Sequence, residues 1–445
     1  MPETLLVRGG TILTMNPARE ILRGDVLVED GAIAAVGDVD PGFKADATID
    51  AREGVILPGF VQAHLHLCQT LFRNCADDLP LLEWLRRRIW PLEAAHDEKT
   101  MRAAARLGIY ESVDAGVTSA LDMGSVRHYG AVFDEAGRAG LRLVGGKAMM
   151  DDDAGGAVPE GLRESTRSSI EESLSLCAKW DGAGNGRMRY AFAPRFALSS
   201  SPELHREVVL QAAARGALVH THASENVEEV AAVKRKFGKG NVELLADLGV
   251  LEVPCTIAHA IHLEDREFDR LHGSRAGIAH CPASNLKLGS GIADVPRLRE
   301  AGVPVGLGSD GAACNNRLDP FRDMFLAASL AKLRGGADTL PAWEALEMAT
   351  IEGARAIGLG GVCGSIEVGK RADLAVLRLG APWTVPAESI ASAIVYAADA
   401  RNVEAVVCDG EILKERGKVL VLDSEEVVAR AREAWGALTA RAALA

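Results

Sequence analysis

Three absences limit what this chain can be. No apolar run approaches the roughly 20 residues that a helix needs to span a bilayer, and the segment from Met1 to Met15 carries Glu3 and Arg8 where a signal peptide would be apolar. Basic residues are not in excess: 49 Lys plus Arg against 62 Asp plus Glu give a net charge of −13, which repels phosphate backbones. No CxxC pair occurs among the eight Cys. We therefore expect a cytoplasmic protein with reduced thiols that binds neither membranes nor nucleic acid.

The remaining composition is that of a large globular protein. The chain has 445 residues, of which 48% are hydrophobic and 25% charged. That length can bury a large core, and it fits two or three domains or one barrel with additions.

From Gly59 onward, short apolar runs alternate with helix-length stretches such as Lys99 to Asp114, Pro202 to Arg215 and Val227 to Leu248. This alternation predicts an α/β protein with a (β/α)8 TIM barrel. We expect the barrel strands at Phe60 to Leu65, Val117 to Asp122, Leu141 to Met150, Met188 to Ala193, Ala217 to Thr221, Thr256 to Ala260, Ala276 to His280 and Val303 to Gly308.

Both ends of the chain are rich in β-forming residues. Short runs before Pro58 are punctuated by Gly9-Gly10 and Asp30-Gly31, which are typical of turns. After the barrel, Ala372 to Leu379, Ala391 to Val395 and Val403 to Cys408 also read as strands. We predict a small β-sandwich domain built from residues 1–58 and 365–420, a barrel over 59–364, and a C-terminal amphipathic helix within 421–445, from Ser424 to Leu444.

Several metal-ligating residue types fall at the ends of the predicted barrel strands. His64 and His66 end the first strand, and their i, i+2 spacing points both imidazoles to one side. His220 and His222 share a face of the fifth strand in the same way, so either can be a ligand, and Asp310 ends the eighth. The carboxyl ends of barrel strands converge on one face. Three imidazoles and one carboxylate suit Zn²⁺ or Fe²⁺ and leave room for a water molecule.

Two neighbours of these residues refine the expected chemistry. The fourth strand contains no Lys that could bridge two metals, so one divalent ion is favoured. Glu225 comes three residues after His222, past the end of the strand, where a carboxylate can take a proton from water and pass it to a leaving nitrogen. The alternative is a glutamate that only stabilises a helix N-terminus, which beside a pair of ligands is the weaker interpretation.

The segment from Pro58 to His66, His222 with Glu225, His259, Gly308-Ser309-Asp310 and the segment from Gly364 to Leu374 together resemble the amidohydrolase superfamily. Within it they resemble the branch of cytosine, guanine and adenosine-type deaminases, which also holds the s-triazine hydrolases. The resemblance implies one divalent metal, zinc ahead of iron. The implied metal ligands are His64, His66, His222 and Asp310. The implied catalytic residues are Glu225 as proton shuttle, His259 as the group that orients the attacking water, and Asp310 as a second proton carrier.

The loops expected to bind the substrate resemble two different groups of enzymes. The segments around Trp84 and Glu93 resemble the methylthioadenosine and S-adenosylhomocysteine deaminases, which implies that Trp84 packs on the substrate and Glu93 accepts from ribose hydroxyls. Gln69 and Arg195 instead resemble guanine deaminase and the triazine hydrolases, where such side chains bind the heterocycle. A more widely shared segment adds two further substrate-binding candidates, Ser284 and Asn285.

We therefore predict a metal-dependent aminohydrolase that releases ammonia from a purine nucleoside, specifically a 5′-substituted adenosine such as 5′-deoxyadenosine, methylthioadenosine or S-adenosylhomocysteine. The expected partner is this small heterocyclic substrate. Glu93 favours a nucleoside over a free base, because its implied role requires a sugar. Gln69 and Arg195 keep open a guanine deaminase or an s-triazine amino- or chlorohydrolase. A non-catalytic scaffold on the same fold is disfavoured because every ligand position is filled. We also expect a homo-oligomer, a dimer or a tetramer.

Overall fold

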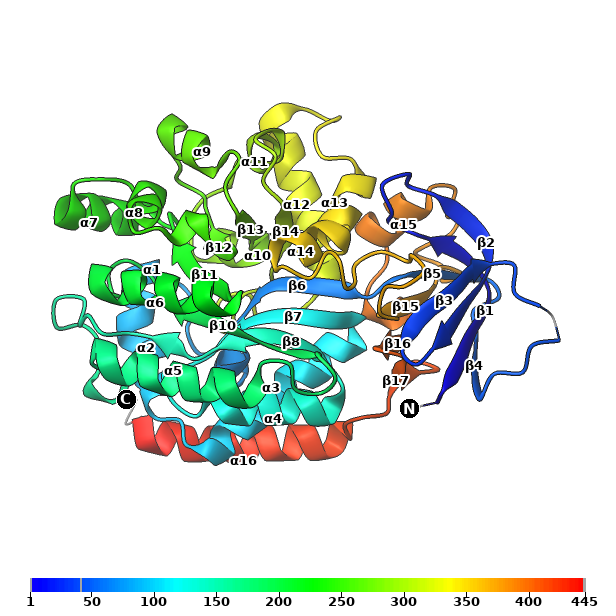
Figure 1. The fold of residues 1–445 in the computed structure, drawn as a ribbon, viewed down its shortest axis with the longest axis horizontal. Helices are drawn as coiled ribbons and strands as arrows, with labels where there is room; N and C mark the ends of the chain where they lie inside the picture. The colour runs from blue at the N-terminus through cyan, green and yellow to red at the C-terminus, as the bar shows by residue number, and fades with distance from the viewer. Residues whose placement is uncertain (1, 41, 443–445) are drawn as a thin grey trace.

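The computed structural model describes residues 2–40 and 42–442, and its centre is a barrel of eight parallel strands (Figure 1). Each of the eight predicted apolar runs overlaps one of these strands. The strands are β6 (Phe60–Leu65), β7 (Val117–Met123), β8 (Arg142–Gly146), β10 (Met188–Pro194), β11 (Leu218–Ala223), β12 (Cys255–His259), β13 (Ala276–His280) and β14 (Val305–Leu307), with β9 (Ala148–Met149) paired to β10.

The barrel closes at the end where its strands finish. The backbone N–H of Asp310 donates to the carbonyl of His64 over 3.0 Å, and Leu65 and Asp310 form an isolated parallel bridge. The segment that follows the last strand is thereby attached to the end of the first. Two of the predicted metal ligands are therefore brought together by the closure of the fold itself.

The helices pack around the barrel because each carries an apolar side and a defined beginning. Asp97 caps α3 through a capping box with Thr100, and Ser201 caps α6, in which Pro202 occupies the first turn. The main helices are α3 (Glu98–Asp114), α4 (Tyr129–Ala139), α5 (Thr166–Trp180), α6 (Pro202–Arg215), α7 (Val227–Phe237), α8 (Asn241–Asp247), α9 (Asp265–Leu271), α10 (Pro282–Lys287), α11 (Val295–Glu300), α12 (Pro320–Gly335), α13 (Ala342–Met348) and α14 (Ile351–Ala356).

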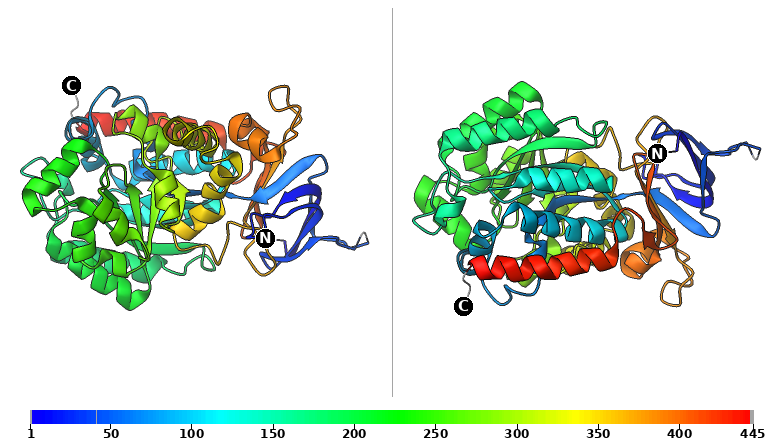
Figure 2. Two further views of the ribbon diagram at one scale, coloured as in Figure 1. Left: turned by 90° about the horizontal axis from the view of Figure 1, so that it is seen from above. Right: turned by 90° about the horizontal axis from the view of Figure 1, so that it is seen from below.

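Strands from both ends of the chain form one further sheet, which lies at the end of the barrel where the barrel strands begin (Figures 1 and 2). Its central pairing joins β5 antiparallel to β15. The order is β18-β17-β16-β15-β5-β1-β2-β3, with β4 also on β1. Their bounds are β1 (Thr4–Leu13), β2 (Ile21–Glu29), β3 (Ala32–Gly37), β4 (Ala47–Asp50), β5 (Gly54–Pro58), β15 (Leu374–Arg378), β16 (Val403–Cys408), β17 (Glu411–Glu415) and β18 (Lys418–Val419).

This sheet curls until its distant parts meet. The turn between β2 and β3 approaches the turn between β16 and β17 so closely that a Cβ on Gly410 would lie 2.6 Å from the Cα of Gly31. Apolar residues of β1, β2 and β3 share one hydrophobic cluster with those of β15 and β16. The layer therefore encloses a small core of its own, separate from that of the barrel.

The structure corrects three of the expected local features. Gly9-Gly10 is not a turn but a bulge within the continuous strand β1, where Gly9 adopts a φ of +80° and the register to β2 shifts. Ala391 to Val395 is not a strand but part of helix α15 (Ile390–Tyr396), which Ser389 caps. The stretch from Val227 to Leu248 is two helices, because Gly238 ends α7 in the left-handed conformation.

The C-terminal helix α16 (Ser424–Ala442) packs along α3 and reaches α2 (Figure 2), and the predicted end at Leu444 lies outside the described residues. Its expected apolar face is buried at Val427, Ala431 and Leu438, whereas Val428 is 42% exposed. Within the described residues, every helix is too short or too polar to span a bilayer.

The segment between β6 and α3 covers the site. It contains η1 (Leu67–Phe72), α1 (Leu81–Trp84), the single π-helical turn η2 (Leu85–Ile89) and α2 (Trp90–Ala94). Gln69, Trp84 and Glu93 lie on η1, α1 and α2 respectively, and all three side chains are buried. Residues predicted to meet the substrate are thus carried by a compact helical cover.

Candidate active site

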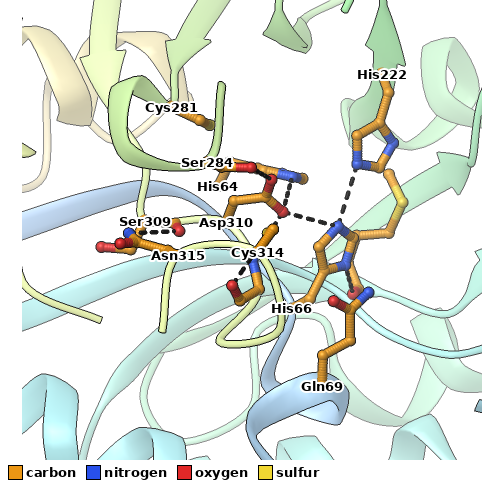
Figure 3. A network of polar contacts seen from close by, with 12 residues as sticks. His64, His66, Gln69, His222, Cys281, Ser284, Ser309, Asp310, Cys314 and Asn315 are labelled. Carbon is orange, nitrogen blue, oxygen red and sulfur yellow. Dashed lines mark hydrogen bonds and ion pairs between the residues drawn. The ribbon is translucent and has the colours of Figure 1, made fainter. Parts of the chain in front are cut away.

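Four of the predicted ligand side chains converge above the carboxyl ends of the barrel strands (Figure 3). The Nε2 atoms of His64 and His66 each lie 3.4 Å from Oδ1 of Asp310. Nε2 of His66 also lies 3.1 Å from Nε2 of His222. Two ligands of one tetrahedral ion, each about 2.1 Å from it, would lie about 3.4 Å apart, so these separations fit a shared metal.

The hydrogen bonds on the other side of two rings determine which nitrogen faces the centre. Nδ1 of His66 lies 2.8 Å from the carbonyl oxygen of Met123, and Nδ1 of His222 lies 2.8 Å from that of Arg195. A carbonyl oxygen only accepts, so each Nδ1 carries the proton. In the neutral rings both Nε2 atoms then present lone pairs to one another across 3.1 Å. A cation between them would turn this repulsion into two bonds.

The protonation states agree with this donor set. Burial, reinforced by the charge of His64, lowers the pKa of His66 to about 3, and burial brings that of His222 well below its usual value. Burial would raise the pKa of Asp310, but His64, whose Nε2 faces the carboxylate across 3.4 Å, holds it well below the ordinary range. The centre therefore offers neutral imidazoles and a carboxylate, which is what a divalent metal requires.

His220 points away from this centre, although it shares a strand with His222. Its Nε2 lies 2.8 Å from Nδ1 of His64. His64 keeps its Nε2 toward Asp310, fully buried and without a hydrogen-bond partner. The geometry thus favours His222 as the ligand and makes His220 the residue that orients His64.

Asp310 is held by its neighbours. Ser284 donates to its Oδ2 over 2.6 Å, and the N–H of Gly311 donates to its Oδ1 over 2.8 Å. The backbone of Asp310 has a φ of +60°, which is uncommon for a residue with a side chain. Ser309 beside it is bonded to Gln62 and to the buried Asp323. The surroundings therefore maintain a strained conformation at the carboxylate.

Glu225 and His259 form the second layer of the site. Oε2 of Glu225 lies 3.4 Å from Nε2 of His259, whose Nδ1 lies 2.9 Å from Oδ1 of Asn285. Burial and the nearby charge of Asp310 raise the pKa of Glu225 well above its usual value. A carboxylate with a raised pKa is a stronger base than usual, which suits a group that takes a proton from water.

The pocket above these groups has a polar floor and an apolar wall. It encloses about 470 Å³, including its open mouth. The floor includes Glu225, His259 and Asp310. Trp84 also lines the pocket, with its buried Nε1 unbonded, and further apolar lining residues are Leu81, Leu85, Phe196 and Leu288. A flat heterocycle with an apolar attachment matches this combination.

The residues proposed to distinguish substrates form one cluster. Glu93 accepts from Arg195 through both carboxylate oxygens, at 2.5 and 3.0 Å, and from Nε2 of Gln69 at 3.0 Å. Gln69 and Arg195 line the pocket, and Glu93 lies behind them. Ser284 and Asn285 are likewise bonded to Asp310 and His259, and their assignment as substrate-binding residues stays a prediction.

Glu229 is a pocket residue that the sequence analysis did not identify. Its carboxyl accepts from the backbone N–H of Glu225 over 3.1 Å and from the side chain of Asn241. Burial and the charge of Glu225 raise its pKa to about 8. The available signal was its position in the first turn of the predicted helix, which begins two residues after Glu225. The apolar wall residues had no comparable signal.

The comparisons with known proteins agree with this arrangement. The sequence matches the amidohydrolase family over residues 55–413. It is 40% identical over 444 residues to a 5-methylthioadenosine/S-adenosylhomocysteine deaminase of Haloarcula marismortui, which covers 98% of this chain and 99% of that protein. It is 36% identical over 440 residues to a 5′-deoxyadenosine deaminase of Methanosarcina acetivorans, with coverage of 98% and 99%.

A solved structure resembles the fold over nearly its whole length. An adenosine deaminase from Xanthomonas campestris, with bound zinc, superimposes with a TM-score of 0.91 at 30% sequence identity and covers 98% of each chain.

Proposed function

Because the chain belongs to the amidohydrolase family, we propose that it hydrolyses the exocyclic amino group of a purine nucleoside and releases ammonia. The deaminases to which it is similar over nearly full length support a hydrolytic deaminase. The observation that carries the proposal is the pair of Nε2 lone pairs of His66 and His222, 3.1 Å apart beside the Asp310 carboxylate and below the pocket.

His64, His66, His222 and Asp310 would hold the divalent metal, with zinc favoured over iron for this donor set. When bound, the ion would act as a Lewis acid and lower the pKa of a water molecule toward neutrality. The orphaned Nε2 of His64 and the opposed lone pairs of His66 and His222 support this fit. The family and the zinc-bound relative support a divalent metal as the cofactor.

The chain's own residues then handle the protons. Glu225 accepts a proton from the attacking water and delivers it to the nitrogen that leaves, for which its raised pKa is suited. His259, fixed by Asn285, orients the water from the side of Glu225. Asp310 receives the remaining hydroxyl proton as the tetrahedral centre collapses and ammonia leaves, and it returns that proton to the ring nitrogen of the product. Ser284 keeps its carboxylate in place.

We propose a 5′-substituted adenosine as the substrate, such as 5′-deoxyadenosine, methylthioadenosine or S-adenosylhomocysteine. Trp84 provides a flat apolar surface, and Leu81 and Leu85 suit an apolar 5′ group. The alternative, guanine or an s-triazine, is favoured by Gln69 and Arg195, because both line the pocket and can bind a heterocycle without a sugar.

We also propose that the enzyme works in the cytoplasm as a dimer or tetramer. All eight Cys are free thiols in the structure, and seven are buried, which supports a reducing compartment.

One assay tests the function directly. Ammonia release is measured with the metal-loaded protein on 5′-deoxyadenosine, methylthioadenosine, S-adenosylhomocysteine, guanine, cytosine and a hydroxytriazine. We expect the adenosines to react with the highest kcat/KM and the Glu225→Gln variant to be slow on all of them. Preference for guanine or the triazine would replace the nucleoside by the alternative. No release from any compound would contradict the proposed function.

A further inference from the structure

Glu93 is surrounded by donors from the protein. Both of its carboxylate oxygens accept from the guanidinium of Arg195, and one also accepts from Gln69. Glu93 and Arg195 are 2% and 3% exposed, and Gln69 is fully buried. The residues that reach the pocket are Gln69 and Arg195, whereas Glu93 does not line it.

A ribose could reach Glu93 only at the expense of this arrangement. A carboxylate has about four acceptor positions, and three are used by Arg195 and Gln69. Moving Arg195 aside would leave a buried guanidinium without its counter-charge, which is strongly unfavourable. The fork-shaped pairing is also the geometry in which Arg and a carboxylate bind most firmly.

Gln69 is held from both sides. Its Nε2 donates to Glu93, and its Oε1 lies so near Gly311 that a Cβ there would come within 2.2 Å. Gly311 follows Asp310, so the amide fits between the metal-ligand loop and the Glu93–Arg195 pair. The direction of the Gln69 amide is therefore set by Glu93 on one side and by packing on the other.

We propose that Glu93 is a positioning residue, which aims Arg195 and Gln69 at the substrate ring and does not bind the sugar. This role deepens the proposed function and rests on it for the reaction. Because the Glu93–Arg195 pair is neutral overall, the cluster selects an uncharged heterocycle that presents acceptors to Arg195. Ring recognition by this cluster is then the same for a nucleoside and for the corresponding free base.

The first test uses the two ribose hydroxyls as a probe. kcat/KM is measured per bound metal for adenosine and 2′,3′-dideoxyadenosine, with wild type, Glu93→Gln and Glu93→Asp. We expect Glu93→Gln to lower kcat/KM about 10- to 100-fold on both compounds, with partial recovery in Glu93→Asp, so that the ratio between the compounds stays unchanged. A site that binds the hydroxyls would instead favour adenosine strongly, and Glu93→Gln would abolish that preference. That result would overturn the proposal.

The second test asks whether Glu93 acts through Arg195. The same rates are measured for Arg195→Met and for Glu93→Gln/Arg195→Met, with Glu83→Gln as control because Glu83 forms an exposed ion pair with Arg87 on the same segment. We expect the double variant to be no slower than Arg195→Met alone, and the control to match wild type. If the double variant lost kcat/KM on adenosine by the product of the two single losses, Glu93 would act independently of Arg195. That result would contradict the proposal.

A third measurement separates this proposal from the proposed function. Thermal unfolding of wild type, Glu93→Gln, Arg195→Met and the double variant, metal-loaded and without substrate, needs no activity. We expect Glu93→Gln to lower the Tm by several degrees and the second substitution to restore part of it, because the buried guanidinium is then removed. If wild type deaminates nothing while this coupling is present, the reaction is wrong and the pairing stands. Additive Tm changes would overturn the positioning role whatever the activity.

Discussion

The two ends of the barrel both bury charged side chains, but they differ in whether Arg side chains pair with the carboxylates at their centres. Where the strands begin, Arg142 donates to Asp373 over 2.7 and 2.9 Å and to Asp409 over 3.1 Å, and Arg371 pairs with the same Asp409. Where the strands finish, His66 and His222 present lone pairs to each other beside the Asp310 carboxylate. Two cations balance two anions at the first end, whereas at the second end no Lys or Arg of the described residues forms an ion pair with Asp310.

The difference shows how buried polarity can be assigned to structure or to chemistry. At the first end, burial is offset by opposite charges, and the pKa of Asp373 is held low, against its burial, by the charge of Arg142. At the second end, burial lowers the pKa of His66, and the buried Nε2 of His64 has no hydrogen-bond partner. Unsatisfied acceptors that converge on one point are the feature that marks the functional end.

The largest effect is expected from removing a ligand. His222→Ala should leave a folded protein that retains little metal and has activity near background, because the remaining donors cannot complete the coordination. His220→Ala removes only the residue that orients His64, and should cost about 10- to 100-fold in metal affinity or activity. Elemental analysis and kcat measured on both variants check this order. If His220→Ala lost the metal and His222→Ala retained it, the ligand assignment would be reversed.

Glu225→Gln should come next. The change preserves volume and hydrogen bonding but removes the group that carries the proton, so kcat should fall about 10²- to 10⁴-fold with metal content unchanged. Steady-state kinetics with parallel metal analysis tests this. The assigned role does not survive an unchanged kcat in a metal-loaded variant.

The ion pairs at the opposite end of the barrel can be disrupted without changing the active site. Arg142→Met leaves the Asp373 carboxylate buried and unpaired, and should lower the free energy of unfolding by about 3–5 kcal/mol. The matched control, Arg138→Met, breaks an exposed pair with Asp134 and should cost less than about 1 kcal/mol. Denaturant titration measures both. We expect kcat/KM per folded molecule to be the same in both variants as in wild type, and a large fall for Arg142→Met would mean that the two ends are coupled.

The smallest effect is expected at Asn285. Asn285→Ala removes one hydrogen bond to the buried His259, and should lower kcat about 5- to 100-fold, equivalent to about 1–3 kcal/mol, with metal retained. If Asn285 instead binds substrate, KM should rise and the size of the effect should vary from one substrate to another. The split between kcat and KM over two adenosines therefore decides between the two roles.

The barrel could be predicted from sequence because alternation of apolar runs and helical stretches is a local signal, and each of the eight runs overlaps a strand. The local errors arose where another interaction outweighed residue preference. Ala391 to Val395 reads as a strand from its β-branched residues, yet Ser389 caps a helix there, in which Ala391, Ile394 and Val395 are buried at helical spacing.

The site could be predicted as a set of residues but not as a geometry. His64, His66, His222 and Asp310 could be placed on strand ends, and strand ends converge. Which of His220 and His222 faces the centre depends on the direction of each ring, which is set by contacts with His64 and the carbonyl of Arg195. The joining of Gln69, Glu93 and Arg195 depends on three elements that are far apart in sequence, and no local pattern reports it.

The pairing of β5 with β15 has a consequence for how the protein is made. Pro58 and Leu374 are partners in this ladder, so one edge of β5 leaves the ribosome about 300 residues before the strand that covers it. At about 5–20 residues per second, that edge waits about 15–60 s during translation. Gly54 to Pro58 is buried throughout in the finished protein, and an uncovered apolar edge is a template for misassociation. The barrel, which is joined to β5 through Gly59, is synthesised while this edge is unpaired. The nascent chain is therefore most open to misassociation through β5 in the interval between synthesis of β5 and synthesis of β15.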